Sequence, residues 1–312
     1  YDTGKIEGFD VEEVQKQSGV VLHRTPDHDL NKEDSVIGKV NGERRKQLTQ
    51  HHSTTHMVNA GSREELGEHI YQAGANKTTQ KGRLDITHYE KPNQKTIYQI
   101  EQKVRKIISE DHEINVLKRP KSEAEQKYGF RIYQGGAPPG NNIRLIDIED
   151  VDIEACGGTH LKQTKNAEEF VITDCTRIQD GVIRLEYKAG QAAREFQRDM
   201  EIRIERASEI LGSEISSDPR EVQRELCKIY SVEPEHLVNT IERFLNEADE
   251  FGEKIGDLSK FLGKEKKLEE VEEDEVVEHS RKLFQIRKER EKKVEKLESQ
   301  IEDFLEEEIE KD

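Results

Sequence analysis

The sequence lacks the features that membrane and secreted proteins need. Its 312 residues contain no run of about 18 apolar residues, the length that a membrane-spanning helix requires. No positively charged and then apolar segment opens the chain, so a secretory leader is not expected. The three cysteines, Cys156, Cys175 and Cys227, are too few for a disulfide framework. These absences favour a reduced, cytoplasmic protein without a membrane partner.

Apolar residues are also scarce, at 32% of the chain against 38% charged residues. They are nevertheless clustered and often periodic, which favours folded domains over disorder, and the length predicts about two domains. With 50 basic and 67 acidic residues the net charge is −17. A chain of this charge is not a general polyanion binder, so DNA binding is not expected, and any contact with RNA must use local basic patches.

The first part of the chain, residues 1–45, has the character of a small β unit. The segment Tyr1-Asp2-Thr3-Gly4 resembles a turn in the middle of a domain, so we expect the chain to start inside a longer protein. Two strand-like runs follow at residues 19–23 and 35–40, each bounded by Gly, Asn or Asp. We interpret this part as the remnant of a small β-barrel.

Residues 46–189 alternate between helical and strand-like patterns, which predicts an α+β domain. Leu48, His52 and His56 recur at helical spacing, and residues 97–110 repeat apolar positions as an amphipathic helix does. A glycine- and proline-rich loop is expected at residues 135–140. Strands are expected at residues 84–89, 114–117, 143–148, 169–173 and 182–187.

From residue 190 to residue 312 the pattern is helical throughout. Helices are predicted over residues 192–211, 222–230 and 234–262, and the acidic stretch 265–278 is expected to be solvated. In residues 280–311 a narrow apolar stripe is flanked by dense Lys and Glu, which is typical of a coiled coil or a helical hairpin. This stripe could form a homodimer, pack within the chain, or present its basic residues to RNA.

Two short motifs carry the residue types of a metal site. His52 and His56 lie four residues apart in a predicted helix, so both imidazoles can face one ion. The segment Cys156-Gly157-Gly158-Thr159-His160 adds a thiolate and a third imidazole, and its glycines permit a tight turn. Three histidines and one cysteine are a ligand set of tetrahedral Zn²⁺. His51 points about 100° away from His52 on the helix, so we expect it to be exposed.

The residues alone leave the role of this ion open. Four protein ligands make a closed, structural site, whereas three ligands and a water make a catalytic one. Each motif also has a plainer interpretation: the histidine pair can occur by chance, and the cysteine can be an inert packed thiol. Cys175 and Cys227 have no partner at ligand spacing and are expected to be packed thiols.

At these motifs the sequence resembles the editing domain of alanyl-tRNA synthetases, the free-standing AlaX proteins, and the related domain of threonyl-tRNA synthetases. The segment from Glu154 to His160 is a very close match, and residues 177–186 continue it. The same order of motifs includes Tyr1-Asp2-Thr3-Gly4, residues 42–45, residues 67–74 and Arg83-Leu84-Asp85-Ile86. Residues 190–312 resemble the helical linker that follows the editing domain.

The resemblance implies a hydrolase that removes serine or glycine wrongly attached to tRNA(Ala). It implies Zn²⁺ bound by His52, His56, Cys156 and His160, and catalytic roles for Gln72 and Cys156. Thr54, Thr55, Gly157 and Gly158 are candidate pocket residues, although the two threonines could instead serve helix packing. The implied partners are the acceptor end of tRNA(Ala) and an aminoacylation domain that this chain does not contain.

Two other functions remain open at this point. The chain could be a non-catalytic module with structural zinc, which would fold with the metal but leave an ester intact. It could also be the editing domain of a threonyl-tRNA synthetase. The chain could be an excised fragment or the product of a divided gene.

Overall fold

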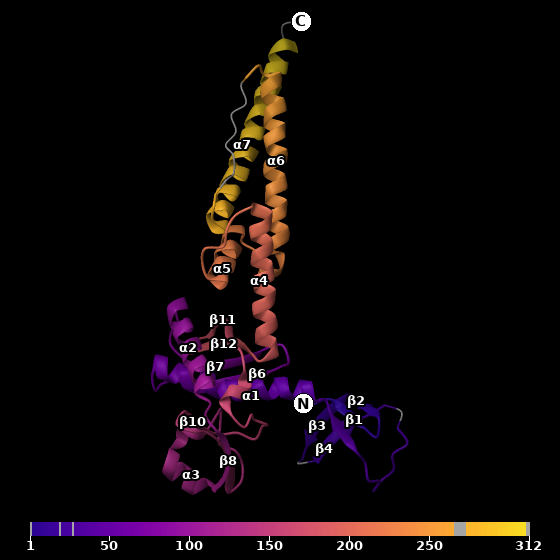
Figure 1. Cartoon of the computed structure of the whole chain (residues 1–312), viewed down its shortest axis with the longest axis vertical. Coiled ribbons are helices and arrows are strands. Elements are labelled where there is room, and N and C mark those ends of the chain that lie inside the picture. Colours follow the sequence, from indigo (N-terminus) through magenta and orange to yellow (C-terminus); the bar gives the residue numbers. More distant parts are fainter. Residues whose placement is uncertain (1, 19, 27, 265–272, 310–312) are drawn as a thin grey trace. The chain divides into compact units, whose positions relative to one another are not determined.

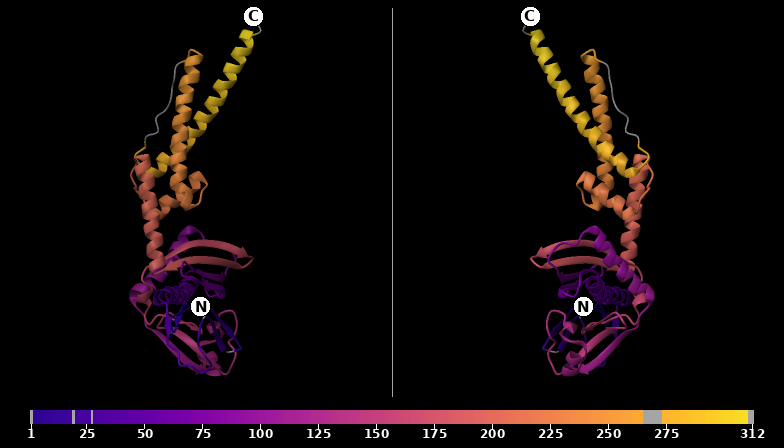
Figure 2. Two further views of the ribbon diagram at one scale, coloured as in Figure 1. Left: turned by 90° about the vertical axis from the view of Figure 1, so that its right-hand side faces the viewer. Right: turned by 90° about the vertical axis from the view of Figure 1, so that its left-hand side faces the viewer.

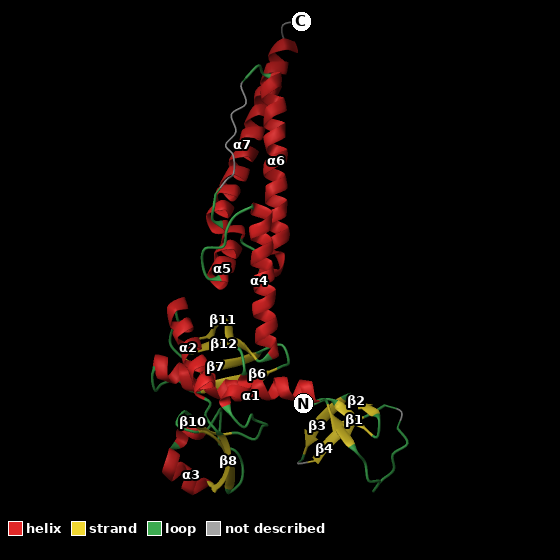
Figure 3. Ribbon diagram, viewed as in Figure 1, coloured by secondary structure: helices red, strands yellow, loops and turns green. Residues whose placement is uncertain are grey.

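The computed structural model describes residues 2–18, 20–26, 28–264 and 273–309 of the chain. It divides into two compact units, residues 1–196 and residues 197–312 (Figure 1). Strands gather in the first unit, whereas the described elements of the second unit are helices (Figure 3), so the α+β class is confirmed. Among the described residues no helix is both long and apolar enough to cross a membrane. The predicted domain boundaries at residues 45/46 and 189/190 stay predictions.

The first strands of the chain form two small antiparallel units. Strands β1 (Gly4–Ile6), β2 (Phe9–Val11) and β5 (Gly38–Val40) make a three-stranded sheet in the order β2-β1-β5, and β3 (Glu13–Gln17) pairs with β4 (Val20–Arg24). In the described part of these residues the strands do not close into a barrel. The strand expected at residues 35–40 is shorter and begins at Gly38.

A four-stranded antiparallel sheet in the order β11-β12-β7-β6 forms the centre of the first unit. Its strands are β6 (Gln72–Lys77), β7 (Gly82–Thr87), β11 (Phe170–Gln179) and β12 (Val182–Ala189). In β7 and β12 the side chains alternate, so Leu84, Ile86, Ile183, Leu185 and Tyr187 share one buried face. Two helices, α1 (Gly42–Leu66) and α2 (Gln94–Glu110), pack on this face, and Figure 2 shows the long β11–β12 pair running over α1.

The amphipathic pattern of residues 97–110 is realised in α2. Ile97, Ile100, Val104, Ile107 and Ile108 all point into the core that α1 and the central sheet share. The helix begins at the cap Asn93, whose side chain accepts a hydrogen bond from the Thr96 amide, and it ends at Asp111 in a left-handed conformation.

A smaller three-stranded sheet, in the order β10-β9-β8, completes the first unit. Strands β8 (Ile114–Pro120), β9 (Asn142–Ile148) and β10 (Asp152–Ala155) carry α3 (Lys121–Tyr128) and the 3₁₀ turn η1 (Phe130–Ile132) on one face, over a small core. The inner ends of β8 and β9 join the main core through Ile114, Ile146 and Ile148. Strand β10 then leads into the segment Cys156–His160, and a second 3₁₀ turn, η2 (Thr164–Ala167), precedes β11.

The second unit contains most of α4 (Gln191–Leu211), which starts in the first unit. It also holds α5 (Pro219–Tyr230), the 3₁₀ turn η3 (Pro234–His236), α6 (Leu237–Phe261) and α7 (Val276–Ile309). Helices α6 and α7 run parallel: Glu247 pairs with Arg287 and, further along both helices, Lys254 pairs with Glu298. The stripe therefore packs against a parallel helix of the same chain. Its residues Leu283, Val294 and Leu297 are buried within the chain, while most of the acidic stretch 265–278 lies outside the described residues.

Candidate metal centre

Helix α1 supplies two of the predicted ligands. It starts at the cap Asn41, whose side chain accepts a hydrogen bond from the Arg44 amide, and continues for 25 residues. Its middle is covered on several sides, and even polar residues there are buried. His52 and His56 lie one turn apart on the side that faces β10 and the segment after it.

The other two ligands come from the turn that follows β10. The Cys156 amide donates to the carbonyl of Arg144 in β9, and the Arg144 guanidinium donates back to the Cys156 carbonyl at 2.6 Å. Gly158 passes so close to His52 that a Cβ atom on it would overlap the imidazole ring. A glycine is therefore required at this position to let the turn approach α1.

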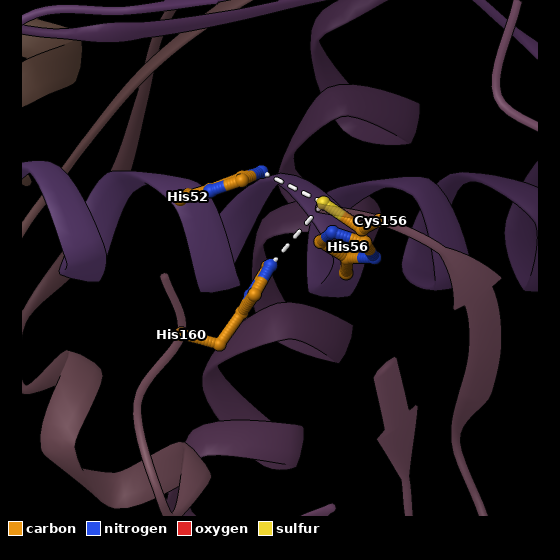
Figure 4. A group of neighbouring side chains, drawn as sticks. All are labelled: His52, His56, Cys156 and His160. Carbon is orange, nitrogen blue, oxygen red and sulfur yellow. Dashed lines mark hydrogen bonds between the residues drawn. The ribbon is translucent and has the colours of Figure 1, made fainter. Parts of the chain in front are cut away.

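The four predicted ligands converge (Figure 4). One candidate ligand atom from each of His52, His56, Cys156 and His160 lies within 4.8 Å of all the others. The Sγ atom of Cys156 is 3.3 Å from Nε2 of His52 and 3.3 Å from Nε2 of His160. Ligands at Zn–N and Zn–S bond lengths and a tetrahedral angle lie about 3.6 Å apart, so the donor set fits Zn²⁺. We call these four residues the His/Cys cluster.

A second layer of side chains fixes two of the imidazoles. His56 Nδ1 lies 2.5 Å from the Glu154 carboxylate, and Asn59 donates to the other oxygen of that carboxylate at 2.5 Å. Ser53 Oγ lies 3.2 Å from Nδ1 of His160 and accepts the Leu161 amide at 2.9 Å. In both histidines Nδ1 is thus engaged, which leaves Nε2 for a metal, as in many protein zinc sites.

The surroundings shift the pKa values of the cluster in different directions. Burial opposes ionisation of the Cys156 thiol, but hydrogen bonds from His160, His52 and His56 outweigh it and lower the pKa of Cys156 to about 3. Burial lowers the pKa of His160 to about 4. His56 is buried too, but the Glu154 carboxylate raises its pKa to about 10. Thiolate and neutral His160 are thus ready to bind a cation, whereas His56 must first release a proton.

Behind His56 lies a buried pair of carboxyl groups. Asp152 and Glu154 lie two residues apart on β10, so their side chains share one face of the strand. Arg63 pairs with Asp152 at 2.9 Å. Burial raises the pKa of both groups, but the His56 charge and hydrogen bonds outweigh it at Glu154, whose pKa is lowered to about 2. Asp152, facing that negative charge, has a raised pKa. One carboxyl group therefore supports His56, and Arg63 holds its neighbour in place.

The remaining predicted site residues lie outside the cluster. Gln72 is half-buried at the start of β6, in register with Ile86 of β7. Thr54 and Thr55 are buried and donate to backbone carbonyls one turn earlier, and Thr55 also meets the Tyr187 hydroxyl at 2.6 Å. These contacts are those of helix packing. Gly157 is exposed beside the cluster.

One prediction about α1 was wrong. His51 was expected to be exposed, but it is fully buried. Its Nδ1 lies 2.7 Å from the Thr78 carbonyl in the β6–β7 turn, and its Nε2 lies 3.2 Å from the Gln47 amide. The β6–β7 turn covers the side of α1 that a simple amphipathic helix would leave to solvent. Cys175 is buried, and the half-buried Cys227 packs on the core of the second unit, as expected.

Sequence reasoning also missed the supporting residues Ser53, Asn59 and Asp152, and gave Glu154 no role. Of these residues only Glu154 could have been noticed in the sequence, because it is a charged residue two positions before Cys156. The contacts of Ser53 and Asn59 join residues about 100 positions apart, so no local pattern could indicate them.

Comparison with known proteins identifies related sequences. Residues 143–186 match the family described as the threonyl and alanyl tRNA synthetase second additional domain. Alanine–tRNA ligases from Methanococcus maripaludis (strain C7) and Saccharolobus islandicus (strain M.14.25) are each 39% identical to the chain, over 84% and 80% of its length. The chain belongs to the alanyl-tRNA synthetase family.

The family match and the alignments with the ligases differ in length. Residues 143–186 include Cys156 and His160. They do not include His52 and His56, which come earlier in the chain. The ligase from Methanococcus vannielii is 37% identical to the chain over 89% of its length. The aligned segment makes up 28% of the Methanococcus maripaludis ligase, 26% of the Saccharolobus islandicus ligase and 29% of the Methanococcus vannielii ligase. The chain thus spans less than a third of the length of these relatives.

Proposed function

We propose that this chain is the editing part of an alanyl-tRNA synthetase and hydrolyses the ester that joins a wrong amino acid to tRNA(Ala). The observation that carries this proposal is the convergence of His52, His56, Cys156 and His160 in a chain whose relatives are alanine–tRNA ligases. The substrates are seryl- and glycyl-tRNA(Ala), and the partners are the acceptor end of tRNA(Ala) and the aminoacylation domain.

The need for a second site follows from the chemistry of the amino acids. Glycine lacks only the methyl group of alanine, and one methyl group in a pocket gives about 10- to 200-fold discrimination. Serine adds only a hydroxyl, which an apolar pocket rejects weakly. A separate hydrolytic site can accept serine through a polar contact and leave alanine attached.

The His/Cys cluster would hold Zn²⁺ through three imidazole nitrogens and one thiolate. Bound there, the ion would hold the Cys156–His160 turn against α1 and so shape the pocket that receives the 3′ end of the RNA. Four protein donors fill a tetrahedral shell, which favours a positioning role for the site over one in which the ion carries its own water. Gly158 lets the Cys156–His160 turn lie directly against His52, and Gly157 remains exposed for contact with substrate.

The reaction itself is a simple hydrolysis. Water adds to the carbonyl carbon of the amino acid, which is esterified to the ribose of the terminal adenosine. The bond between this carbon and the ribose oxygen then breaks, and the ribose oxygen leaves as a hydroxyl with a proton from the water. We assign the Gln72 amide to positioning of the aminoacyl group, with Thr54, Thr55, Gly157 and Gly158 as weaker candidates. Cys156 acts through its place in the metal site.

The direct test is a deacylation assay of the full chain with one equivalent of Zn²⁺. We expect release of serine and glycine from tRNA(Ala), and alanine should stay attached. The Cys156→Ala and His52→Ala variants should lose this activity, and Gln72→Ala should lose much of it with its zinc content unchanged. An intact seryl ester in the presence of the wild-type chain and zinc would contradict the proposal.

The same assay separates the two other candidate functions. A non-catalytic zinc module would show zinc-dependent thermal stability with no ester cleavage. The editing domain of a threonyl-tRNA synthetase would hydrolyse seryl-tRNA(Thr) in preference to seryl-tRNA(Ala). The relatives, all alanine–tRNA ligases, support tRNA(Ala).

A further inference from the structure

A cluster of three rings lies on the surface of the first unit, apart from the metal centre. His69 precedes β6, while His88 and Tyr89 follow β7, so the cluster sits where these two neighbouring strands meet. The ring centroids of His88 and Tyr89 are 4.5 Å apart, those of His69 and His88 are 5.1 Å apart, and those of His69 and Tyr89 are 5.7 Å apart. We call these residues the ring cluster.

Hydrogen bonds hold the ring cluster in place. Nε2 of His69 lies 2.8 Å from Nδ1 of His88, and the His88 amide donates to the Gly181 carbonyl. The Thr87 hydroxyl donates to the His69 carbonyl at 2.6 Å and accepts the Tyr71 amide at 2.8 Å. The two imidazoles are thus fixed before any ligand arrives, and the Tyr89 ring lies against both of them.

Although it is held so firmly, the cluster is open on its outer side. His88 is buried beneath its neighbours, but Tyr89 is 68% exposed, and His69 is exposed as well. A cluster in a protein core would bury its largest ring, whereas here the largest ring, that of Tyr89, is mostly exposed to solvent. Rigid exposed rings over a buried one are the arrangement of a stacking platform for a flat ligand.

The charge around the ring cluster favours a nucleobase over a phosphate. Tyr89 is followed by Glu90 and Lys91, both exposed, and Glu68 beside His69 pairs with Arg131 at 3.1 Å. Local charges therefore nearly cancel, and a ligand held here would be recognised through its π face. Unpaired bases of RNA are recognised in this way by aromatic and histidine side chains.

The position of the ring cluster connects it with the proposed site. Strand β6 starts at Gln72, three residues after His69, and ends at Lys77. The carbonyl of Thr78, directly after β6, lies 2.7 Å from Nδ1 of His51, the neighbour of the candidate ligand His52, so this end of β6 lies near the metal centre. Strand β6 thus leads from the ring cluster towards the metal centre, so an RNA 3′ end that enters the metal centre can pass the ring cluster.

We propose that the ring cluster is a stacking platform for an unpaired nucleotide of the RNA 3′ end, a few nucleotides before the end that enters the metal centre. This inference rests on the proposed function because it takes an aminoacylated RNA as the ligand. Tyr89 supplies the stacking face, and His69 and His88 hold that face in place.

Fluorescence of 2-aminopurine tests the platform directly. The full chain, loaded with Zn²⁺, is titrated into an RNA hairpin with an unpaired 3′ tail that carries 2-aminopurine at one tail position at a time. Stacking on Tyr89 should quench the probe at one position before the last nucleotide. Tyr89→Ala should abolish that quenching and weaken binding about 5- to 100-fold, whereas Tyr89→Phe should retain both.

A lone exposed tyrosine serves as the matched control. Tyr98 on α2 is 58% exposed and contacts no other ring within the described parts of the chain. Tyr98→Ala should leave the quenching unchanged. Because stacking releases no counterions, Tyr89→Ala should also leave the slope of log K against log salt unchanged.

Three outcomes would overturn the proposal. They are no quenching with the wild-type chain, quenching that survives Tyr89→Ala, and equal losses in the Tyr89→Ala and Tyr98→Ala variants. None of these readouts measures ester cleavage. A chain that quenches the probe but leaves the seryl ester intact would refute the proposed function and keep the platform, and the reverse result would refute the platform alone.

Discussion

Individual side chains in this protein carry out two different tasks at the metal centre. In the proposed site His52, His56, Cys156 and His160 would supply the donor atoms, and a second set of residues would orient those atoms. His56 is the clearest case because its Nδ1 is held by Glu154, which Asn59 holds in turn. The affinity for a metal therefore depends on residues that never touch it.

Glu154→Gln should show this dependence. The amide keeps the shape of the side chain but removes the negative charge that holds His56, so we expect zinc affinity to fall about 10- to 100-fold. Competition with a chromophoric chelator measures this affinity. Glu149→Gln, an exposed position just before β10, is the control and should have no effect. Equal zinc affinity in Glu154→Gln and the wild type would remove Glu154 from the site.

The pKa values of the cluster predict how many protons zinc displaces. Cys156, with a pKa of about 3, and His160, with a pKa of about 4, have already lost their protons at pH 7, whereas His56 keeps its proton up to a pKa of about 10. Zinc binding should therefore release about one proton, and the apparent affinity should rise about tenfold per pH unit between pH 6 and 9.

Calorimetry in buffers of different ionisation enthalpy counts these protons. Release of two or more protons at pH 7 would mean that the thiol or a second imidazole is protonated in the free protein. That result would contradict the account of the cluster.

At the scale of elements, the sequence patterns were reliable where one face of an element is buried. The amphipathic helix over residues 97–110 and the strand over residues 143–148 are found within a few residues of their predicted bounds, as α2 and β9. The patterns were misleading where an element is covered on several sides. α1 buries His51, Thr54 and Asn59 at once, so its polar sequence gave no sign of its central position.

Long-range pairing was also beyond the reach of local patterns. The apolar stripe of residues 280–311 indicated that α7 packs on a helix, but it contained no information on direction. The parallel pairing with α6 joins residues 40 positions apart, such as Glu247 and Arg287. In the same way, the two ligand motifs suggested a common metal ion but did not indicate the supporting residues Ser53, Asn59 and Glu154.

The turn after β10 gives a prediction at this scale. A Cβ atom on Gly158 would overlap the His52 ring, whereas the same atom on Gly157 would meet open space. Gly158→Ala should therefore push the turn away from α1 and weaken zinc binding strongly, while Gly157→Ala should bind zinc as the wild type does. Zinc content after dialysis against a dilute chelator distinguishes the two variants. Equal retention in both would show that the turn adapts without loss.

At the scale of the whole molecule, the two units bury separate cores. Met57, Ile100 and Tyr187 belong to the core of the first unit, while Leu226, Ile241 and Leu283 belong to that of the second. All four residues of the His/Cys cluster lie in the first unit. A ligand that binds only this cluster should therefore stabilise one unit and leave the other unchanged.

Scanning calorimetry should accordingly show two transitions. Zinc at about 100 times its Kd adds about 2.7 kcal/mol, which should raise the Tm of the first unit by about 5–10 °C. The transition of the helical unit should not move, and His56→Ala should abolish the shift. A single transition that shifts as a whole would show that the two units unfold together.

X-ray absorption at the zinc edge is the most direct test of the central claim that four side chains of this chain bind one ion. For the full chain with one equivalent of zinc, we predict three nitrogen ligands at about 2.0–2.1 Å and one sulfur ligand at about 2.3 Å. The sulfur shell should vanish in Cys156→Ser. A wild-type spectrum without sulfur, or one fitted by oxygen ligands alone, would contradict the account.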